Sequence, residues 1–370
     1  YIGPIDGHDI ENMIKVFNAV KLMNTPVLLH VYTDKSKGYN SENHDAIKSY
    51  SVSVSEKSDI SNKISYSKVL GEILYRLDDK FHFHCVTAAM EIGTGLKSFI
   101  NKSPKKYIDV GIAEEHAVTY AAGLSAAGIL PVVAIYSTFM QRAYDQIIHD
   151  IALQELPAIF CMDRGGLVGN DGPTHHGVFD IAFMRSIPGL IVTAPSNGNE
   201  MYNLIYSAMK NKWIFSIRYP KENTVFDNDY NPEEIEVGTW EIVEYGKNIC
   251  ILTFGSMLET CIEVARKQKN DNNVNITIVN CRFIKPLDTN ILNNLTQNHN
   301  NFLIVEEGVL SGGFGSSILE YFSLNSINKN VKLIGINDEF TEQGTREELM
   351  KLVGLDFVSI NNIVNQISDE

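Results

Sequence analysis

Short, nearly uninterrupted apolar runs alternate along the middle of the chain with longer segments whose apolar residues recur at helical spacing. The apolar runs lie at 84–87, 131–135, 158–162 and 190–194. Helical spacing is clearest at 66–77 and 115–128. Strands that are apolar on both sides are typical of a parallel sheet with helices on both faces. The pattern therefore predicts an α/β domain in this part of the chain.

A second set of apolar runs follows, at 249–254, 276–279, 302–306 and 331–335. Helical segments near 257–269 and 316–322 separate them, which predicts a second α/β domain. Between the two sets, residues 219–230 lose their apolar periodicity and contain Pro220, Lys221 and Asp227. We interpret this stretch as a linker.

The first 55 residues predict only a helix at 9–22 and a β-rich run at 26–33, followed by a polar loop. One helix and one strand cannot bury a core alone. We expect this segment to be the remnant of a larger α/β domain or an arm on the next one. The chain starts at Tyr1 without a basic or apolar targeting segment, so we expect it to begin within a longer protein.

Composition narrows the function classes. The 370 residues carry a formal net charge of −14, which argues against nucleic-acid binding through a basic surface. The longest apolar run, 121–136, is shorter than the roughly 20 residues needed to span a bilayer, so no membrane segment is expected. Five cysteines without a CxxC pair argue against a disulfide framework or a zinc site and favour a reducing compartment.

The first cluster of chemically active residues is the run 109–118. Here Glu114 and Glu115 stand where a strand leads into a helix, and the positive end of the helix dipole favours a carboxylate. Simple capping would explain this placement. The following residues, 121–128, are small and apolar, so we expect a buried helix and a sheltered acid whose pKa is open to tuning.

The second cluster, 163–177, directly follows an apolar strand, at the edge where open α/β sheets bind ligands. It combines several glycines with Arg164, Asp171, His175 and His176. These types suit anion binding and proton transfer, although a surface turn would look similar. Between the clusters, Tyr136, Phe139 and Arg142 also follow a strand and suit a planar ring next to an anion.

Six runs together carry a family resemblance: 1–9, 34–39, 113–116, 136–142, 171–177 and 341–349. In order and spacing they closely resemble the 1-deoxy-D-xylulose-5-phosphate synthases, which are transketolase-like thiamine-diphosphate enzymes. The resemblance implies an α/β chain with two parallel or mixed-sheet domains of the transketolase type and a short remnant of a third. It divides the chain into the end of a diphosphate-binding domain (1–55), a pyrimidine-binding domain (56–225) and a C-terminal domain (226–370).

The resemblance also implies a reaction and a set of roles. The family joins pyruvate to glyceraldehyde 3-phosphate and releases carbon dioxide, in the non-mevalonate isoprenoid pathway. Glu114 matches the acid on the cofactor's pyrimidine ring, Phe139 the ring that stacks on it, and Tyr39 a residue beside the cofactor. The resemblance implies that the cations among the remaining matches bind phosphate or carboxylate, and that His175 transfers protons or stabilises an oxyanion. The matches that line the substrate channel are Tyr136, Arg142, Arg164, Asp171, His175, Arg218 and Lys221.

Some positions depart from the family. His176 stands where glutamine is usual, Lys221-Glu222 where Arg-Gly is usual, and Tyr50 where a histidine is common, with His44 as an alternative. The Gly-Asp-Gly motif that holds Mg²⁺ and the cofactor's diphosphate is missing. We therefore assign no metal ligand to this chain, and we expect the ligands of Mg²⁺ to lie upstream of Tyr1 or on another chain.

Several alternatives stay open at this point. The beta subunit of a 2-oxo-acid dehydrogenase also leaves the diphosphate to a partner, but it would lack a segment like residues 1–39. Transketolase itself and a non-catalytic transketolase-like subunit are further options. We expect a homodimer, and the Asn- and Lys-rich insertions suggest a plastid-type organelle, or the cytoplasm if the source is bacterial.

Two weaker patterns have structural explanations. The glycine-rich run 312–316 opens a helix and resembles a phosphate-binding turn, but we expect it to serve packing. His149 is expected to be a buried histidine whose hydrogen bonds are satisfied within the fold.

Overall fold

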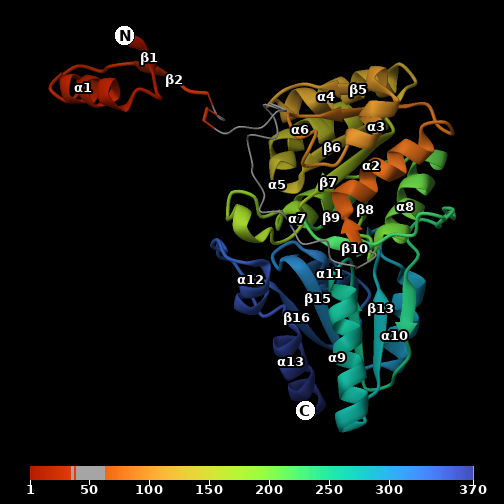
Figure 1. The fold of residues 1–370 in the computed structure, drawn as a ribbon. Coiled ribbons are helices and arrows are strands. Elements are labelled where there is room, and N and C mark those ends of the chain that lie inside the picture. The colour runs from red at the N-terminus through yellow and green to blue at the C-terminus, as the bar shows by residue number, and fades with distance from the viewer. Residues whose placement is uncertain (35–36, 39–62, 370) are drawn as a thin grey trace. The chain divides into compact units, whose positions relative to one another are not determined.

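The computed structural model describes residues 1–34, 37–38 and 63–369, and its contacts divide the chain into two compact units, Tyr1–Ser61 and Asn62–Glu370 (Figure 1). Tyr39, His44 and Tyr50 lie outside the described residues. The expectations for these three positions therefore stay predictions.

Within its described residues, the first unit contains two parallel strands and one helix: β1 (Ile2–Asp6), α1 (Ile10–Val20) and β2 (Leu29–Tyr32). Asp9 caps the helix by accepting a hydrogen bond from the Asn12 N–H. None of the α1 residues is buried, and Ile10, Ile14 and Phe17 are at least half exposed. The predicted helix and strand are both present in this unit, and they do not enclose a core of their own.

The second unit begins with a domain built on a seven-stranded sheet, which we call the seven-stranded domain. Its strands are β3 (Lys63–Ser65), β4 (Phe83–Thr87), β5 (Tyr107–Asp109), β6 (Leu130–Tyr136), β7 (Ala158–Asp163), β8 (Ile191–Thr193), β9 (Ile214–Tyr219) and β10 (Asn223–Val225). Its helices are α2 (Tyr66–Leu77), α3 (Lys97–Lys102), η2 (Pro104–Lys106), α4 (Glu114–Ala126), α5 (Ser137–Met140), η3 (Gln141–Ala143), α6 (Tyr144–Gln146), η4 (Ile147–Ala152), η5 (Gly169–Asp171), α7 (Asp180–Arg185) and α8 (Gly198–Asn211). With β14 (Phe283–Lys285), which comes later in the chain, the sheet order is β14-β8-β9-β7-β6-β4-β5, and all pairs are parallel except β14 with β8. Strands β3 and β10 form a separate two-stranded sheet.

The rest of the unit is the five-stranded domain, whose sheet has the order β11-β13-β12-β15-β16 with only β11 antiparallel. Its elements are β11 (Glu241–Glu244), β12 (Ile249–Thr253), α9 (Met257–Asn272), β13 (Ile276–Asn280), β14 (Phe283–Lys285), α10 (Thr289–Asn298), β15 (Asn301–Val309), α11 (Phe314–Leu324), β16 (Asn330–Ile336), α12 (Arg346–Leu352) and α13 (Phe357–Asp369). Helices α9 and α13 pack together on one face of this sheet, visible at the front in Figure 1, and their apolar residues form a core with β12, β13 and β15. The fold class expected from the apolar runs, two mixed α/β domains, is confirmed.

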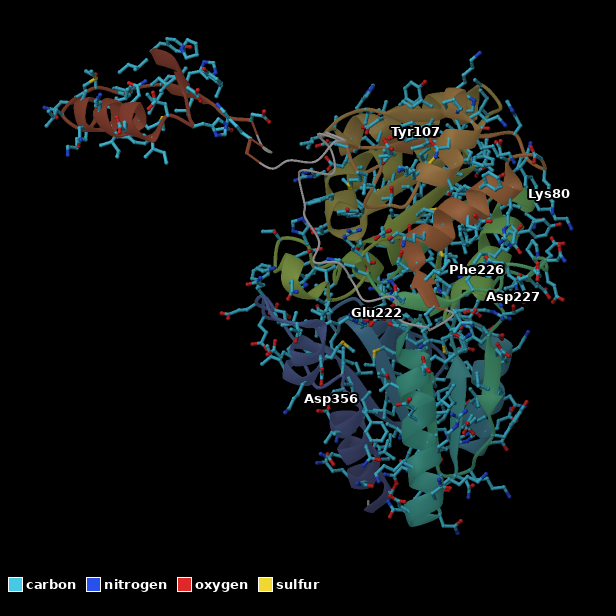
Figure 2. The ribbon with its side chains drawn as sticks, viewed as in Figure 1. Lys80, Tyr107, Glu222, Phe226, Asp227 and Asp356 are labelled. Carbon is cyan, nitrogen blue, oxygen red and sulfur yellow. The ribbon has the colours of Figure 1, made fainter. Side chains whose placement is uncertain are left out.

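The two domains of the second unit are joined by shared structure. Strand β14 belongs to the five-stranded domain in sequence but completes the edge of the seven-stranded sheet beside β8. The interpretation of 219–230 as a plain linker is wrong in part, because Tyr219 ends the buried strand β9 and β10 pairs with β3. Figure 2 shows Glu222, between these strands, at the level where the two domains meet.

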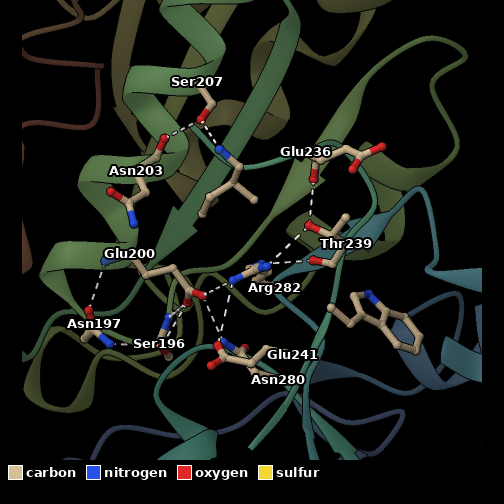
Figure 3. Close-up of polar contacts among 12 residues, drawn as sticks. Ser196, Asn197, Glu200, Asn203, Ser207, Glu236, Thr239, Glu241, Asn280 and Arg282 are labelled. Atoms are coloured by element: carbon tan, nitrogen blue, oxygen red, sulfur yellow. Dashed lines mark hydrogen bonds and ion pairs between the residues drawn. The ribbon is translucent and has the colours of Figure 1, made fainter. Parts of the chain in front are cut away.

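Glu200, a buried carboxylate on α8, makes further contacts between the two domains (Figure 3). Glu200 of α8 accepts hydrogen bonds from the Ser196 N–H (2.6 Å) and from Asn280 Nδ2 (2.9 Å), and Arg282 lies 3.5 Å away. Asn280 is the last residue of β13, and Arg282 directly precedes β14. The Glu200 side chain therefore contacts the segment that leads from the five-stranded sheet to the edge of the seven-stranded sheet. Such a fully paired buried acid fixes the relative placement of the packed elements.

Candidate active site

The site forms at the carboxyl ends of β6 and β7, beside the point where the strand order of the seven-stranded sheet reverses. The chain runs from β4 outward to β5 and returns to β6 on the other side of β4, and sheets of this kind bind ligands beside such a reversal. Tyr136 ends β6, and Phe139 and Arg142 follow in the short helices α5 and η3. The rings of Tyr136 and Phe139 stack with their centroids 5.8 Å apart, and the Arg142 guanidinium lies 4.9 Å from the Phe139 centroid.

Glu114 is the first residue of α4 and is 1% exposed. Its Oε1 accepts a hydrogen bond from Arg142 Nη1 at 2.7 Å. Among the described residues nothing donates to its second oxygen, Oε2. Arg142 thus holds one oxygen of this acid, and the described residues leave the other without a donor.

Helix α4 itself is less buried than expected. Ala117, Val118, Ala121 and Ala122 face the core, but the side that carries Glu115, His116, Thr119 and Tyr120 is exposed. The expectation of a deeply buried helix is therefore wrong, while Glu114 is sheltered because it lies on the inner face.

Arg164 turns back from the end of β7 and lies over the ring of Tyr136, with 3.7 Å from its guanidinium carbon to the ring centroid. Its φ of 63° is in the left-handed region, which is unfavourable for a residue with a side chain and is found at functional sites. Nη1 donates to Asp163 at 2.8 Å and to the Gly93 carbonyl at 3.0 Å. Burial raises the pKa of Asp163 to about 6, although Arg164 and the Ser67 hydroxyl act against it.

Asp171 joins Arg164 to Lys221. Both carboxylate oxygens of Asp171 accept hydrogen bonds from Lys221 Nζ at 2.8 Å, and Arg164 Nε lies 3.6 Å away. Burial alone would raise the pKa of Asp171, but the hydrogen bond and the charges of Lys221 and Arg164 outweigh it and lower the pKa. Two cations therefore surround this acid on the open side of the site.

His175 completes the cluster. Its ring meets the edge of Phe139 with centroids 5.3 Å apart, and its Nδ1 lies 2.9 Å from the Thr174 hydroxyl. A continuous series of contacts thus connects the sequence-predicted residues Glu114, Arg142, Phe139, His175, Tyr136, Arg164, Asp171 and Lys221.

Arg218 does not belong to this cluster. It is 5% exposed, and its Nε donates to Asp180 at 2.7 Å while Nη2 donates to the carbonyls of Glu307 (3.0 Å) and Gly177 (3.3 Å). In this structure internal acceptors occupy Nε and Nη2 of Arg218, and the expectation that it holds a substrate phosphate or carboxylate stays a prediction. In this structure it ties Gly177 to Glu307 of the five-stranded domain.

The two weaker patterns also have clear outcomes. Glu306 fills the start of α11, where it accepts hydrogen bonds from the N–H groups of Phe314 (2.7 Å) and Gly315 (2.9 Å). An internal acid thus takes the place of a phosphate, and the structural explanation for the run 312–316 is confirmed. The expectation for His149 is wrong, because its side chain is 62% exposed and lies beside Asp145.

Sequence reasoning missed several residues that shape the site. A Cβ on Gly93 would lie 1.6 Å from the Tyr136 hydroxyl, so this glycine makes room for the ring. Glu307 of β15 is 3% exposed and forms two hydrogen bonds with Arg346. Arg346 lies in the run 341–349, whose only signal was its match to the family pattern.

Thiamine diphosphate can be tested against these residues. An aminopyrimidine needs a sheltered carboxylate for its ring nitrogen and an aromatic surface for its face, and Glu114 Oε2 and the half-buried Phe139 provide both. For the diphosphate end, the described residues contain no group of three or more His, Cys, Asp or Glu side chains placed to hold a metal ion. The chain therefore fits the pyrimidine end of the cofactor.

No helix within the described ranges is long and apolar enough to cross a membrane.

Three family models match the chain. Residues 1–33 match the model described as 1-deoxy-D-xylulose-5-phosphate synthase, residues 62–225 match the transketolase pyrimidine binding domain, and residues 238–360 match the transketolase C-terminal domain.

Curated relatives agree with these matches. The 1-deoxy-D-xylulose-5-phosphate synthases of Aquifex aeolicus and Dictyoglomus thermophilum are 42% and 44% identical to the chain, over 98% and 96% of its length. These alignments cover 59% and 58% of the relatives, so the chain spans about three fifths of their length.

Solved structures resemble the fold at lower identity. A split-gene transketolase, described as an inactive beta4 tetramer, matches with a TM-score of 0.74 and 22% identity over 83% of this chain and 99% of its own. The transketolase of Campylobacter jejuni matches with a TM-score of 0.67 and 18% identity, over 82% of this chain and 47% of its own. Both likenesses concern the fold alone.

Proposed function

Because the chain belongs to the 1-deoxy-D-xylulose-5-phosphate synthase family, we propose that it forms the pyrimidine-binding and C-terminal part of such an enzyme. The family uses thiamine diphosphate with a divalent metal. The reaction joins pyruvate to glyceraldehyde 3-phosphate, with loss of carbon dioxide, and gives 1-deoxy-D-xylulose 5-phosphate. The observation that carries the proposal is the contact-linked series of side chains from Glu114 to Lys221. It brings a sheltered acid, an aromatic ring and two cations, each paired with an acid of this chain, together at the carboxyl ends of β6 and β7.

When bound, thiamine diphosphate supplies the nucleophilic carbon that attacks the keto group of pyruvate. Glu114 holds a proton on the pyrimidine nitrogen through Oε2, and Arg142 fixes the carboxylate through Oε1 at 2.7 Å. Phe139 would support the face of the pyrimidine ring, and the imidazole of His175 lies against the edge of Phe139 with centroids 5.3 Å apart.

The substrates are anions, and two cations, Arg164 and Lys221, lie on either side of Asp171. A substrate phosphate or carboxylate can take the place of Asp171 next to one of these cations. Burial raises the pKa of the Tyr136 hydroxyl, which keeps it protonated as a donor at neutral pH. His175 is the group placed to exchange a proton with a substrate oxygen.

Two other functions have less support. The beta subunit of a 2-oxo-acid dehydrogenase does not explain why residues 1–33 match the synthase model or why synthases are 42–44% identical over nearly the whole chain. A non-catalytic subunit has no physical need for a buried acid with one free oxygen beside an aromatic ring. We propose a homodimer as the assembly, and the organelle localisation stays a prediction.

The test is product analysis with protein that contains this chain and a diphosphate-binding domain. Supplied with thiamine diphosphate, Mg²⁺, pyruvate and glyceraldehyde 3-phosphate, it should release one carbon dioxide for each 1-deoxy-D-xylulose 5-phosphate. Parallel assays should offer dihydrolipoamide-linked protein as the acyl acceptor. Acyl transfer to the lipoyl group without sugar-phosphate formation would support the dehydrogenase alternative and contradict this one.

A further inference from the structure

The loop that carries Asp171 and His175 is closed at its base. Gly166 N–H donates to the Gly177 carbonyl at 2.7 Å, and Gly177 N–H donates to the Gly166 carbonyl at 2.8 Å. We call residues 166–177 the site loop. A closed loop of this length needs internal contacts to hold one conformation.

His176 supplies such a contact from inside the loop. It is 4% exposed, and its Nδ1 accepts a hydrogen bond from the Val168 N–H at 3.1 Å. Because Nδ1 accepts, the ring proton is assigned to Nε2, which donates to the Glu342 carbonyl at 3.1 Å. One imidazole thus connects the two halves of the site loop to each other and to the five-stranded domain.

The segment on the other side of this contact grips the loop at two more points. Gln343 Nε2 donates to the Asn170 carbonyl at 3.0 Å, and Arg346 Nη1 donates to the Leu167 carbonyl at 2.7 Å. We call residues 341–346 the strap. Arg346 forms two further hydrogen bonds, of 2.6 and 2.8 Å, with the buried Glu307, and these anchor the strap.

We propose that His176 is a positioning residue: it locks the site loop against the strap and thereby holds His175 against Phe139. This inference rests on the proposed function for its catalytic consequence. His175 is the neighbour of His176 in the chain, so the two backbone-directed hydrogen bonds of the buried ring limit how far the His175 ring can move. The five-stranded domain thus acts on the reaction through this lock.

Two substitutions at position 176 separate the hydrogen bonds from the bulk of the side chain. In His176→Gln, the amide oxygen can accept from Val168 and the amide nitrogen can donate to Glu342. In His176→Leu, a side chain of similar bulk fills the space but forms neither bond. His299→Leu is the matched control, because His299 is 6% exposed and bonds to Thr277 (2.9 Å) and Leu295 (3.2 Å) within the five-stranded domain.

The first readout is amide hydrogen exchange of the site loop. We expect exchange at residues 167–175 to become about tenfold faster in His176→Leu and to stay close to wild type in His176→Gln and His299→Leu. Unchanged protection in His176→Leu would overturn the inference. This readout needs no turnover, so it decides the inference even if the product assay contradicts the proposed function.

The second readout is kinetic, on protein that contains a diphosphate-binding domain. His176→Leu should lower kcat by about tenfold to a hundredfold with little change in KM for either substrate, because a misplaced His175 affects the transition state more than ground-state binding. His176→Gln should restore most of kcat. An equal loss of kcat in His299→Leu, or no rescue by glutamine, would show general destabilisation and overturn the positioning role.

A double-mutant cycle tests whether the strap is the other half of the lock. Gln343 is exposed, so Gln343→Ala removes its hydrogen bond to Asn170 with little risk to folding. If His176 and Gln343 hold the same loop, the effects of His176→Leu and Gln343→Ala on loop exchange should be strongly non-additive. Strict additivity would show that the strap does not act with His176, and would contradict the lock.

Discussion

Arg218 and Lys221 are three positions apart, and their surroundings differ in every respect that matters for charge. Arg218 is 5% exposed and bonds to Asp180, whereas the Lys221 side chain is 40% exposed and bonds to Asp171. A buried ion pair that loses one partner leaves an uncompensated charge, but an exposed pair contributes little to stability. The two cations therefore serve different purposes.

This difference gives a prediction for two methionine substitutions. Arg218→Met should lower the free energy of unfolding by roughly 3–5 kcal/mol, because Asp180 stays buried without its partner. Lys221→Met should change it by less than about 1 kcal/mol. Urea unfolding measures both values, and an undisturbed stability in Arg218→Met would contradict the structural role assigned to it.

The same pair gives a kinetic prediction. Lys221→Met should raise KM about tenfold for glyceraldehyde 3-phosphate and much less for glyceraldehyde, since a charge-assisted hydrogen bond to phosphate contributes roughly 1.5–3 kcal/mol. Steady-state kinetics with both aldehydes provides the comparison. An equal rise for the two aldehydes would place the phosphate elsewhere, with Arg142 and Arg164 as the other cations of the site.

Single residues differ in how far the sequence reveals them. Glu114 could be predicted because a strand-to-helix junction and a small apolar helix are local patterns. The pairing of Arg218 with Asp180 could not, because it joins residues 38 positions apart on different elements. The need for glycine at position 93 depends likewise on the Tyr136 ring, 43 residues further along the chain (136 − 93).

Among the elements, the start of helix α11 contains the most unusual acid of the five-stranded domain. Glu306 is fully buried beneath the first turn, and burial raises its pKa to about 7 against the pull of the Gly315 and Phe314 N–H groups. Its pKa is higher in the folded than in the unfolded chain, so folding binds a proton between about pH 4.5 and 7. The stabilisation from this group is therefore present at low pH and lost as the pH rises through 7.

The expected outcome is a pH-dependent difference between wild type and Glu306→Gln. Between pH 5 and pH 8 the wild-type protein should lose about 2 kcal/mol of unfolding free energy that the glutamine variant does not lose. Urea titrations at both pH values measure it. Parallel pH dependence in the two proteins would mean that Glu306 does not change protonation in this range.

Helices and strands were predictable from the sequence where one or both of their faces are apolar. Short strands that pair with strands distant in sequence were harder to predict. The predicted helix 66–77 matches α2, and β7 lies within one residue of its expected bounds. Strands β10 and β14 were missed, because three residues carry no periodicity and their pairing depends on distant strands. The buried face of α4 was predictable from its small residues, whereas its exposed face was not, because apolar content alone does not say which side is covered.

For the whole molecule, we expect this chain expressed alone to fold without catalysing the reaction. Two large clusters of buried apolar residues support folding of the second unit. The described residues provide the pyrimidine end of the cofactor site, and they contain no metal-binding group for its diphosphate. Without that charged anchor, cofactor binding should weaken by several kcal/mol.

Calorimetry and product analysis test this expectation together. The isolated chain should unfold cooperatively and form no 1-deoxy-D-xylulose 5-phosphate, and addition of a separately produced diphosphate-binding domain should restore measurable turnover. Micromolar, magnesium-dependent binding of thiamine diphosphate to the isolated chain would show an anchor within these residues and contradict the division of the site.

The account depends most on Glu114 as the acid that works on the pyrimidine ring, and exchange of the C2 proton of bound thiamine diphosphate tests this directly. In protein that includes a diphosphate-binding domain, Glu114→Gln should slow this exchange on the order of 10²-fold or more, the range for a positioned proton-transfer group. Glu115→Gln, one residue along the same helix turn but exposed, should exchange at the wild-type rate. Wild-type exchange in Glu114→Gln would contradict the central claim.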